Sequence, residues 1–274
     1  MIYKRTPVII LSGACFGCLI AFAYINPYDG KIVLSELVLQ LSGSRGNIPL
    51  GFSLPELLSF CAKIAPYFLL ELYIGTNLYR HFCTASVYIF SRTSNRSKWY
   101  TRECYSLAIS TLFYQIIFLG TAIGITCLRY QVIWTSAGCW LLLLHIILYS
   151  LWVFSMALLV NTLAILIGSG SSFSIVVIVQ IILITMITMS NPLKTDCNTF
   201  SVVLNVNPIT HLILGWQISS AEWLNEIIHA PWDTLTLRGS LLYMVAVTAL
   251  TLLFGWGVIY KRDLIIADPE FGGM

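Results

Sequence analysis

Few side chains in this chain have the type and spacing that chemistry requires. No metal-ligand spacing links its four histidines, which are His81, His145, His211 and His229. Cys15 and Cys18 form a lone C-x-x-C pair in an apolar stretch, where cysteine usually serves as a small packing residue. The chain has no phosphate-binding G-x-x-x-x-G-K-[ST] loop and offers no Ser/His/Asp set. We therefore expect no catalytic residue, no metal site and no cofactor within the chain, and we do not expect it to be an enzyme.

Two ionisable residues, Glu71 and His145, lie deep within apolar stretches. Ionisable groups at membrane depth are costly and usually mark the path of an ion or substrate, so both are candidates for a transport path. The competing interpretation is structural. Lys63 precedes Glu71 by about two turns of the same helix and is ~80° away around its axis, so the two side chains could share a face loosely. The sequence leaves both interpretations open.

The elements that must position these residues belong to a membrane protein by composition. The chain has 274 residues, of which 58% are hydrophobic and only 10% are charged. A soluble domain carries roughly 25% charged residues, so this chain cannot cover a water-facing surface, and we expect it to be dissolved in the lipid bilayer. Its net charge of +3 is not arranged as a basic stripe interleaved with aromatic residues, so we expect no nucleic-acid partner.

Six apolar segments are each long enough to cross a hydrocarbon core, which takes roughly 20 residues per helix. The predicted spans are residues 7–25, 57–79, 105–128, 136–160, 173–189 and 241–260. We therefore expect an all-α integral membrane protein, with one transmembrane domain over residues 1–274.

Basic residues on alternate connections predict the orientation of these spans. Lys4 and Arg5 precede the first span, a basic cluster occupies residues 80–103 after the second, and Lys261 and Arg262 follow the sixth. Because lysine and arginine gather in cytoplasmic loops, both termini and the 80–103 segment are expected in the cytoplasm. The connections at 26–55 and 190–238 are then outside, and residues 32–41 are expected to form an interfacial helix there.

The 80–103 segment combines arginines with aromatic residues, which are the usual anchors of protein interfaces. A short helix under the membrane would suit docking into a cleft of a soluble partner. The alternative is an inside-positive loop whose aromatic rings lie among the lipid headgroups. The candidate docking residues are Tyr88, Phe90, Arg92, Arg96 and Trp99.

The 190–238 connection contains apolar pieces, at 202–204 and 209–218, that are too short to cross a membrane. Segments of 10–14 apolar residues are typical of re-entrant or interfacial pieces. Between the two pieces, Asn207 precedes Pro208, and a residue before proline is biased away from helix. We expect two short re-entrant helices before the last span, joined by this turn, and a further surface turn at 223–228.

Two of these features resemble the membrane subunit of an ABC transporter, in the six-span export class called ABC two. Residues 85–98 occupy the place of that family's cytoplasmic coupling helix, and Asn207-Pro208-Ile209-Thr210 resembles its N-P-[LI]-T turn. In two respects the chain departs from the pattern: only six residues precede the first span, and the 26–55 connection is longer than a simple hairpin.

The resemblance implies a transport permease in a bacterial cell (plasma) membrane, exporting a peptide, such as an antimicrobial peptide, or another amphiphile. It implies two copies of a separate cytosolic ATPase subunit, which would bind ATP and Mg, and a second permease copy, identical or homologous. Tyr88, Phe90, Arg92, Arg96 and Trp99 would dock the ATPase. The outer gate would be formed by Asn207, Pro208 and Thr210.

Three other interpretations compete with this one. A gradient-driven carrier or channel would favour inverted repeats and charges at the midplane. No clear repeat relates residues 1–137 to 138–274, and Glu71 is the one acidic residue that lies deep. A membrane-embedded enzyme would need clustered reactive side chains at membrane depth. A non-transporting sensor or assembly subunit would fit the same layout of spans.

Overall fold

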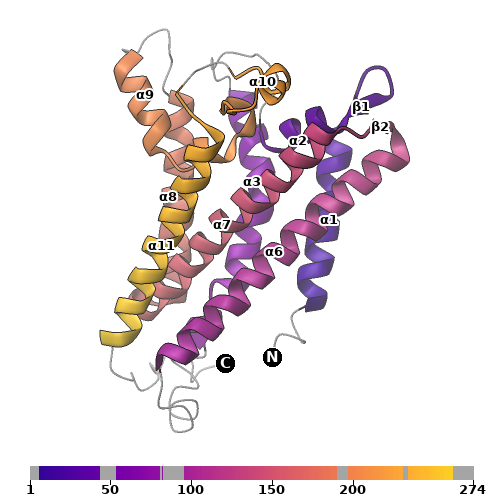
Figure 1. Ribbon diagram of the computed structural model, residues 1–274. Helices are drawn as coiled ribbons and strands as arrows, with labels where there is room; N and C mark the ends of the chain where they lie inside the picture. Colours follow the sequence, from indigo (N-terminus) through magenta and orange to yellow (C-terminus); the bar gives the residue numbers. More distant parts are fainter. Residues whose placement is uncertain are drawn as a thin grey trace.

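The computed structural model describes residues 6–43, 54–80, 82, 96–189, 197–230 and 234–261. Long helices running side by side dominate these residues (Figure 1). They are α1 (Thr6–Tyr24), α3 (Leu54–Ile74), α6 (Arg96–Arg129), α7 (Ser136–Ile167), α8 (Ser169–Met189) and α11 (Leu237–Lys261).

Within the described residues, five helices are long and apolar enough to cross a membrane. They are α1, α6, α7, α11 and the Ser169–Ile187 portion of α8. The helix α3 is 21 residues long, contains Pro66, and packs against α7 and α8. The structure therefore confirms that the described chain is mainly helical, with several helices suited to a membrane.

Two helices are longer than the sequence predicted. The helix α6 begins at Arg96 rather than Tyr105, because residues 96–104 contain no proline or glycine and place Trp99, Tyr100 and Cys104 on the buried side. The helix α7 continues to Ile167 rather than ending at residue 160. The turn between α7 and α8 is a single residue, Gly168. Its φ of +90° is a backbone conformation that glycine adopts readily, so the chain reverses direction without a longer loop.

The connection after α1 contains a strand that an all-α prediction misses. The strand β1 (Lys31–Val33) pairs in parallel with β2 (Gln131–Ile133), which follows α6. The expected helix at 32–41 is present from Leu34 to Leu41 as α2. Its first three predicted residues are divided between the strand and the helix, because Ile32 and Val33 extend to pair with β2.

The connection between α8 and α11 is only partly helical. The structure has α9 (Cys197–Val206) and α10 (Glu222–Ile228), and the latter matches the turn expected at 223–228. The second apolar piece is not the short helix that the sequence predicted. It forms two single 3-10 turns, η3 (Thr210–Leu212) and η4 (Leu214–Trp216), because side chains there bond to nearby backbone in competition with an α-helix.

The two ends of the bundle differ in their elements (Figure 1). The starts of α1 and α6 and the end of α11 lie at one end, which we call the basic end. The described basic residues at the start of α6 and the end of α11 are Arg96, Lys98, Arg102 and Lys261. At the opposite end lie α2, α9, α10 and both strands, where charges of both signs occur. We call this the capped end.

The close approach of α1 to α6 depends on two glycines at i and i+4 of α1. A Cβ at Gly13 would touch the side chains of Ile117 and Tyr114, and one at Gly17 would overlap the Thr121 side chain and the Phe118 carbonyl oxygen. Glycine at this spacing lets helix backbones approach within a membrane, where packing replaces the hydrophobic effect as the driving force.

We predict that Gly17→Ala destabilises the protein by about 1–3 kcal/mol, since the new methyl group would push against a backbone carbonyl that cannot rotate away. The measurement is thermal unfolding of the purified chain in mild detergent. Gly124→Ala is the matched control, because that α6 glycine is exposed and has open space around its Cβ position. Equal melting temperatures for the two variants would contradict this packing.

Candidate functional site

A series of buried polar side chains runs between α3, α7 and α8. We call it the polar column. From the capped end towards the basic end, the column comprises His145, Tyr149, Tyr67, Glu71, Gln180 and Asn161. Ring contacts, one turn of α3 and a hydrogen bond link the members from His145 to Gln180 in turn, and Asn161 bonds to the backbone of Ile74, about one turn beyond Glu71.

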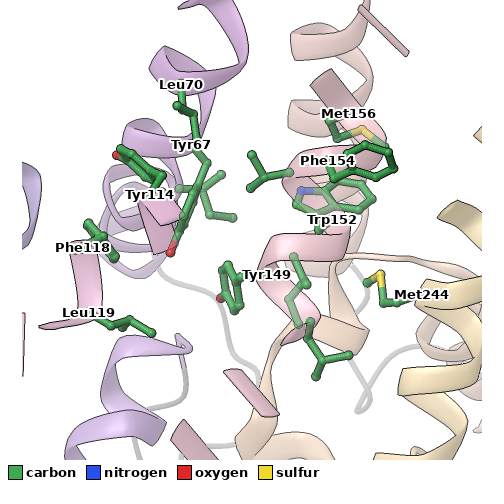
Figure 2. Packing of buried hydrophobic residues seen from close by; sticks show 14 of the residues in the cluster. Tyr67, Leu70, Tyr114, Phe118, Leu119, Tyr149, Trp152, Phe154, Met156 and Met244 are labelled. Carbon is green, nitrogen blue, oxygen red and sulfur yellow. The ribbon is translucent and has the colours of Figure 1, made fainter. Parts of the chain in front are cut away.

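The part of the polar column nearer the capped end is aromatic, and Figure 2 shows Tyr67 and Tyr149 facing each other. The Tyr149 hydroxyl donates to the carbonyl oxygen of Ser42, 3.2 Å away, just after α2. The Tyr149 ring lies 5.3 Å from that of Tyr67 on α3, and the Tyr67 ring makes an edge contact with Phe118 of α6 at 5.6 Å. Three helices therefore meet around Tyr67.

His145 is fully buried and stacks on Tyr149, with ring centroids 4.2 Å apart and planes 13° from parallel. Neither of its ring nitrogens has a hydrogen-bond partner among the described residues. A protonated imidazole would bring two N–H donors and a charge into this environment, so the packing suits the neutral ring. His145, one of the two predicted transport-path residues, is therefore placed by the structure against an aromatic ring, with no hydrogen bond from its imidazole to another described residue.

Glu71, the other predicted transport-path residue, is also fully buried. Its Oε2 accepts a hydrogen bond from Gln180 Nε2 of α8 at 2.7 Å. The loose pairing with Lys63 that the sequence allowed is not the arrangement found. Lys63 Nζ donates to the carbonyl oxygen of Gln40, 2.7 Å away, and lies 5.4 Å from the Tyr24 ring centroid.

Asn161 is the last member of the polar column and lies beside the point where α3 ends, between Ile74 and the next short helix. The chain turns at Gly75 and Thr76 before the short helix α4 (Asn77–Tyr79). Asn161 Oδ1 accepts from the backbone N–H of Leu78 at 2.8 Å, and its Nδ2 donates to the carbonyl oxygens of Ile74 and Ala157. One side chain of α7 therefore satisfies backbone groups on both sides of the break.

The predicted outer-gate residues are brought together at the capped end. Asn207 Oδ1 accepts from the backbone N–H of Ile209 at 2.9 Å, which closes a tight turn around Pro208. Asn207 Nδ2 donates to the carbonyl oxygen of Leu183, which ties the turn to α8 at 2.7 Å. The Thr210 hydroxyl donates to the carbonyl oxygens of Leu204 and Asn207. The turn is thus held by its own side chains.

The residues that follow this turn are buried although they are not α-helical. His211 Nε2 lies 3.0 Å from the carbonyl oxygen of Asn205 and must donate to it, so Nδ1 of the neutral ring accepts from the Ser240 hydroxyl at 2.9 Å. Burial lowers the pKa of His211, which favours this neutral form. Gln217 Nε2 donates to the carbonyl oxygen of His211. The segment from Asn207 to Gln217 is hereafter the buried turn segment.

Of the five predicted docking residues, the structure describes Arg96 and Trp99. Tyr88, Phe90 and Arg92 lie outside the described residues. Trp99 is buried in the first turn of α6, with its ring 6.1 Å from that of Phe82, so its ring serves packing within this chain. Arg96 Nη1 donates to the carbonyl oxygen of Ile259 at 3.5 Å, which joins the start of α6 to the end of α11.

No role for Gln180 or Tyr67 was predicted from the sequence, and the predicted fourth span, 136–160, ended one residue before Asn161. One available signal was the spacing of Tyr67 and Glu71 at i and i+4, which puts both on one face of α3. Another was Asn161 itself, a strongly polar residue inside an otherwise unbroken apolar run, where the cost of burial demands partners.

A cavity of about 440 Å³ opens between α6, α7 and α11. Its lining is largely apolar and includes Tyr105, Leu112, Ile147, Phe154 and Leu252. Of the lining hydroxyls, those of Thr111 and Thr248 are hydrogen-bonded within the chain, whereas Ser150 Oγ has no hydrogen-bond partner among the described residues. This groove therefore offers volume and apolar contact but few polar groups to orient a ligand.

Comparison of the chain with models of protein families, with curated proteins and with solved structures gave no match. Functional inference therefore comes from the chain's own residues and their arrangement.

We predict that Asn161→Leu destabilises the protein, because it leaves two buried backbone groups unpaired, the Leu78 N–H and the Ile74 carbonyl. Each unpaired group should cost about 1–3 kcal/mol. The melting temperature in detergent is the readout. Asn205→Leu is the control, because the exposed Asn205 side chain bonds only to Ser201 within its own helical turn. A control that falls as far as Asn161→Leu would argue against a special role for the buried amide.

Proposed function

We propose that this chain is the transmembrane permease subunit of an ATP-driven transporter of the ABC two class. It would lie in the plasma membrane of a bacterium and export a peptide or another amphiphilic compound. A separate cytosolic ATPase, in two copies, would bind ATP and Mg and supply the energy. A second permease copy, identical or homologous, would complete the transport path.

One observation carries this proposal: a buried, non-helical turn with its own hydrogen bonds lies at the capped end, away from the basic end. Irregular backbone at membrane depth is tolerated only where protein buries it or where it lines water. Asn207, Ile209 and Thr210 are at most 4% exposed, and their backbone and side-chain groups are paired as described above. Such a device suits an outer gate because it can be held closed without water.

The proposed topology has six spans, with α3 as the second. Both termini and residues 80–103 would be cytoplasmic, and residues 26–55 and 190–238 would be outside. The concentration of lysine and arginine around the basic end supports this orientation, since cytoplasmic loops carry an excess of those residues. Under this proposal the buried turn segment is re-entrant from the outer face.

Contacts of α11 with α6 at the basic end and with the buried turn segment at the capped end support the permease mechanism. The Tyr100 hydroxyl at the start of α6 donates to the carbonyl oxygen of Leu252 of α11 at 2.8 Å, and Arg96 reaches Ile259 of the same helix. At the other end of α11, Ser240 bonds to His211, and the Tyr243 ring stacks on the His211 ring at 4.1 Å.

We infer that an ATPase bound at residues 80–103 displaces the start of α6, that α11 follows, and that the buried turn segment opens or closes in response. The ATPase can shift this equilibrium only if its nucleotide-bound and nucleotide-free forms make different contacts with the permease. Substrate would then cross along the interface between the two permease copies.

A gradient-driven carrier is the second candidate, and the burial of Glu71 favours it. A carboxyl group at membrane depth is a typical element of ion-coupled transport. The energy source discriminates between the two candidates. A permease of the proposed class requires ATP and its partner, whereas a carrier transports alone in liposomes under an imposed proton gradient.

We predict that Phe90→Ala and Arg92→Glu each reduce copurification of an ATPase with the tagged full chain at least tenfold, because an aromatic or arginine anchor contributes about 2 kcal/mol or more to an interface. Membranes of the native cell are solubilised, and the bound ATPase is detected by photolabelling with azido-ATP.

The matched controls lie at the capped end: Tyr28→Ala removes an exposed aromatic ring, and Arg238→Glu reverses an exposed charge. Both should leave copurification unchanged. An ATPase retained equally by all four variants, or the absence of any labelled ATPase with the wild-type chain, would contradict the proposal.

A further inference from the structure

The polar pair between α3 and α8 leaves two buried oxygen atoms without partners. Glu71 and Gln180 are both fully buried, and one hydrogen bond joins Gln180 Nε2 to Glu71 Oε2. The remaining oxygens, Glu71 Oε1 and Gln180 Oε1, have no hydrogen-bond partner among the described residues. Two unpaired acceptors in one side-chain pair are costly in a low-dielectric interior, so their coincidence requires an explanation.

We propose that Glu71 and Gln180 form a proton-binding site, in which a proton on Glu71 Oε1 is donated to Gln180 Oε1. A carboxylic acid and a primary amide are complementary. The amide N–H donates to one acid oxygen, and the acid O–H donates to the amide oxygen. The first of these bonds is present at 2.7 Å, and one added proton would satisfy both remaining oxygens together.

The surroundings of the pair favour a neutral acid over a carboxylate. The helix α8 carries no ionisable side chain, and no described residue forms an ion pair with Glu71. The other helices packed against α3 are α7, α1 and α6. On α6 the ionisable side chain that contacts α3 is Tyr114, whose hydroxyl donates to the carbonyl oxygen of Pro66. The ionisable side chains of α1 and α7, with those described on α3 itself, are Cys15, Cys18, Tyr24, Cys61, Lys63, Tyr67, Tyr73, Cys139, His145 and Tyr149.

None of these groups supplies a counter-charge at Glu71. His145 stacks on Tyr149 with both nitrogens unpartnered, and Lys63 Nζ bonds to Gln40. Thiols and phenols carry no positive charge in either protonation state, so none of them can pair with a carboxylate as a cation. Desolvation without a compensating charge penalises the ionised form of a carboxyl group, so a proton is held at this position.

A metal cation fits the pair less well than a proton does. Hard cations in proteins take six or more oxygen ligands, whereas the pair offers two free oxygens. Among the described residues, no group of three or more metal-ligating side chains comes together. A proton needs only the two oxygens that are present.

The proposed proton makes the contact between α3 and α8 sensitive to protonation. With the proton bound, two hydrogen bonds join the helices and no charge is buried. When the proton leaves, a carboxylate faces the Gln180 oxygen, and repulsion and desolvation both oppose close packing. Proton release is therefore favoured by separation of α3 from α8, and proton binding by their closure. This inference does not depend on the energy source of transport, so it stands apart from the proposed function.

The test uses the full chain in lipid nanodiscs and two probes. Dicyclohexylcarbodiimide modifies protonated carboxyl groups in apolar surroundings, and mass spectrometry locates the modified residue. We expect Glu71 to be labelled at pH 7, while the exposed Glu226 is not. Infrared difference spectra between pH 7 and alkaline pH should show the carbonyl stretch of a protonated carboxylic acid, and that band should be absent from Glu71→Gln.

Glu71→Gln is expected to fold, because two amides can form the same pair of hydrogen bonds. It also tests the linkage between protonation and stability. The native chain keeps a proton that an unfolded chain releases at neutral pH, so raising the pH should lower the melting temperature of the wild type. The melting temperature of Glu71→Gln should fall less over the same range.

Three results would overturn the proposal. The first is an unlabelled Glu71 at pH 7 together with an infrared spectrum showing only ionised carboxylates. The second is protection of Glu71 by sodium or potassium chloride but not by an equal ionic strength of choline chloride, which would assign the site to a metal cation. The third is an identical pH dependence of stability for the wild type and Glu71→Gln.

Discussion

The interior of a bilayer provides no water to hydrogen-bond with polar groups, and the rest of the structure depends on that constraint. Long helices satisfy their own backbone, and wherever a helix stops inside the bundle a side chain takes over. Asn161 pairs with backbone on both sides of the break after α3, and Asn207 and Thr210 do the same around Pro208. Buried amides and hydroxyls therefore hold the chain where these helices stop, and those are the places where the structure can change at moderate cost.

The same constraint explains why the functional candidates lie on a few connected helices. The start of α6 is bonded to α11, and α11 is bonded to the buried turn segment, so a displacement at the basic end reaches the capped end through packed protein. The polar column follows a separate route along α3. Its pair of Glu71 and Gln180 adds a contact whose strength depends on a proton, which would bias the packing of α3 against α8.

Sequence patterns that depend on local chemistry predicted the structure well. Apolar length located the long helices, and the Asn-Pro dipeptide located the turn at Pro208. Features set by distant contacts were not predictable in this way. Gln180 is 109 residues from Glu71, so no spacing rule pairs them. The strands β1 and β2 have three residues each and exist only because α1 and α6 bring them together. The helix α7 extends past Asn161 because that amide finds partners on α3, which a one-dimensional pattern cannot show.

The central claim is that hydrogen bonds within the protein, rather than bonds to water, hold the turns of the buried turn segment, although the segment is not α-helical. Hydrogen–deuterium exchange of the full chain in lipid nanodiscs tests this directly, with the exposed turn around Tyr28 as a fast reference within the same molecule. The backbone amides that make these bonds, which are those of Ile209, Thr210, Leu212, Ile213, Trp216 and Gln217, should exchange as slowly as those in the middle of α7. Exchange of that segment as fast as the reference turn, while α7 stays protected, would contradict the account.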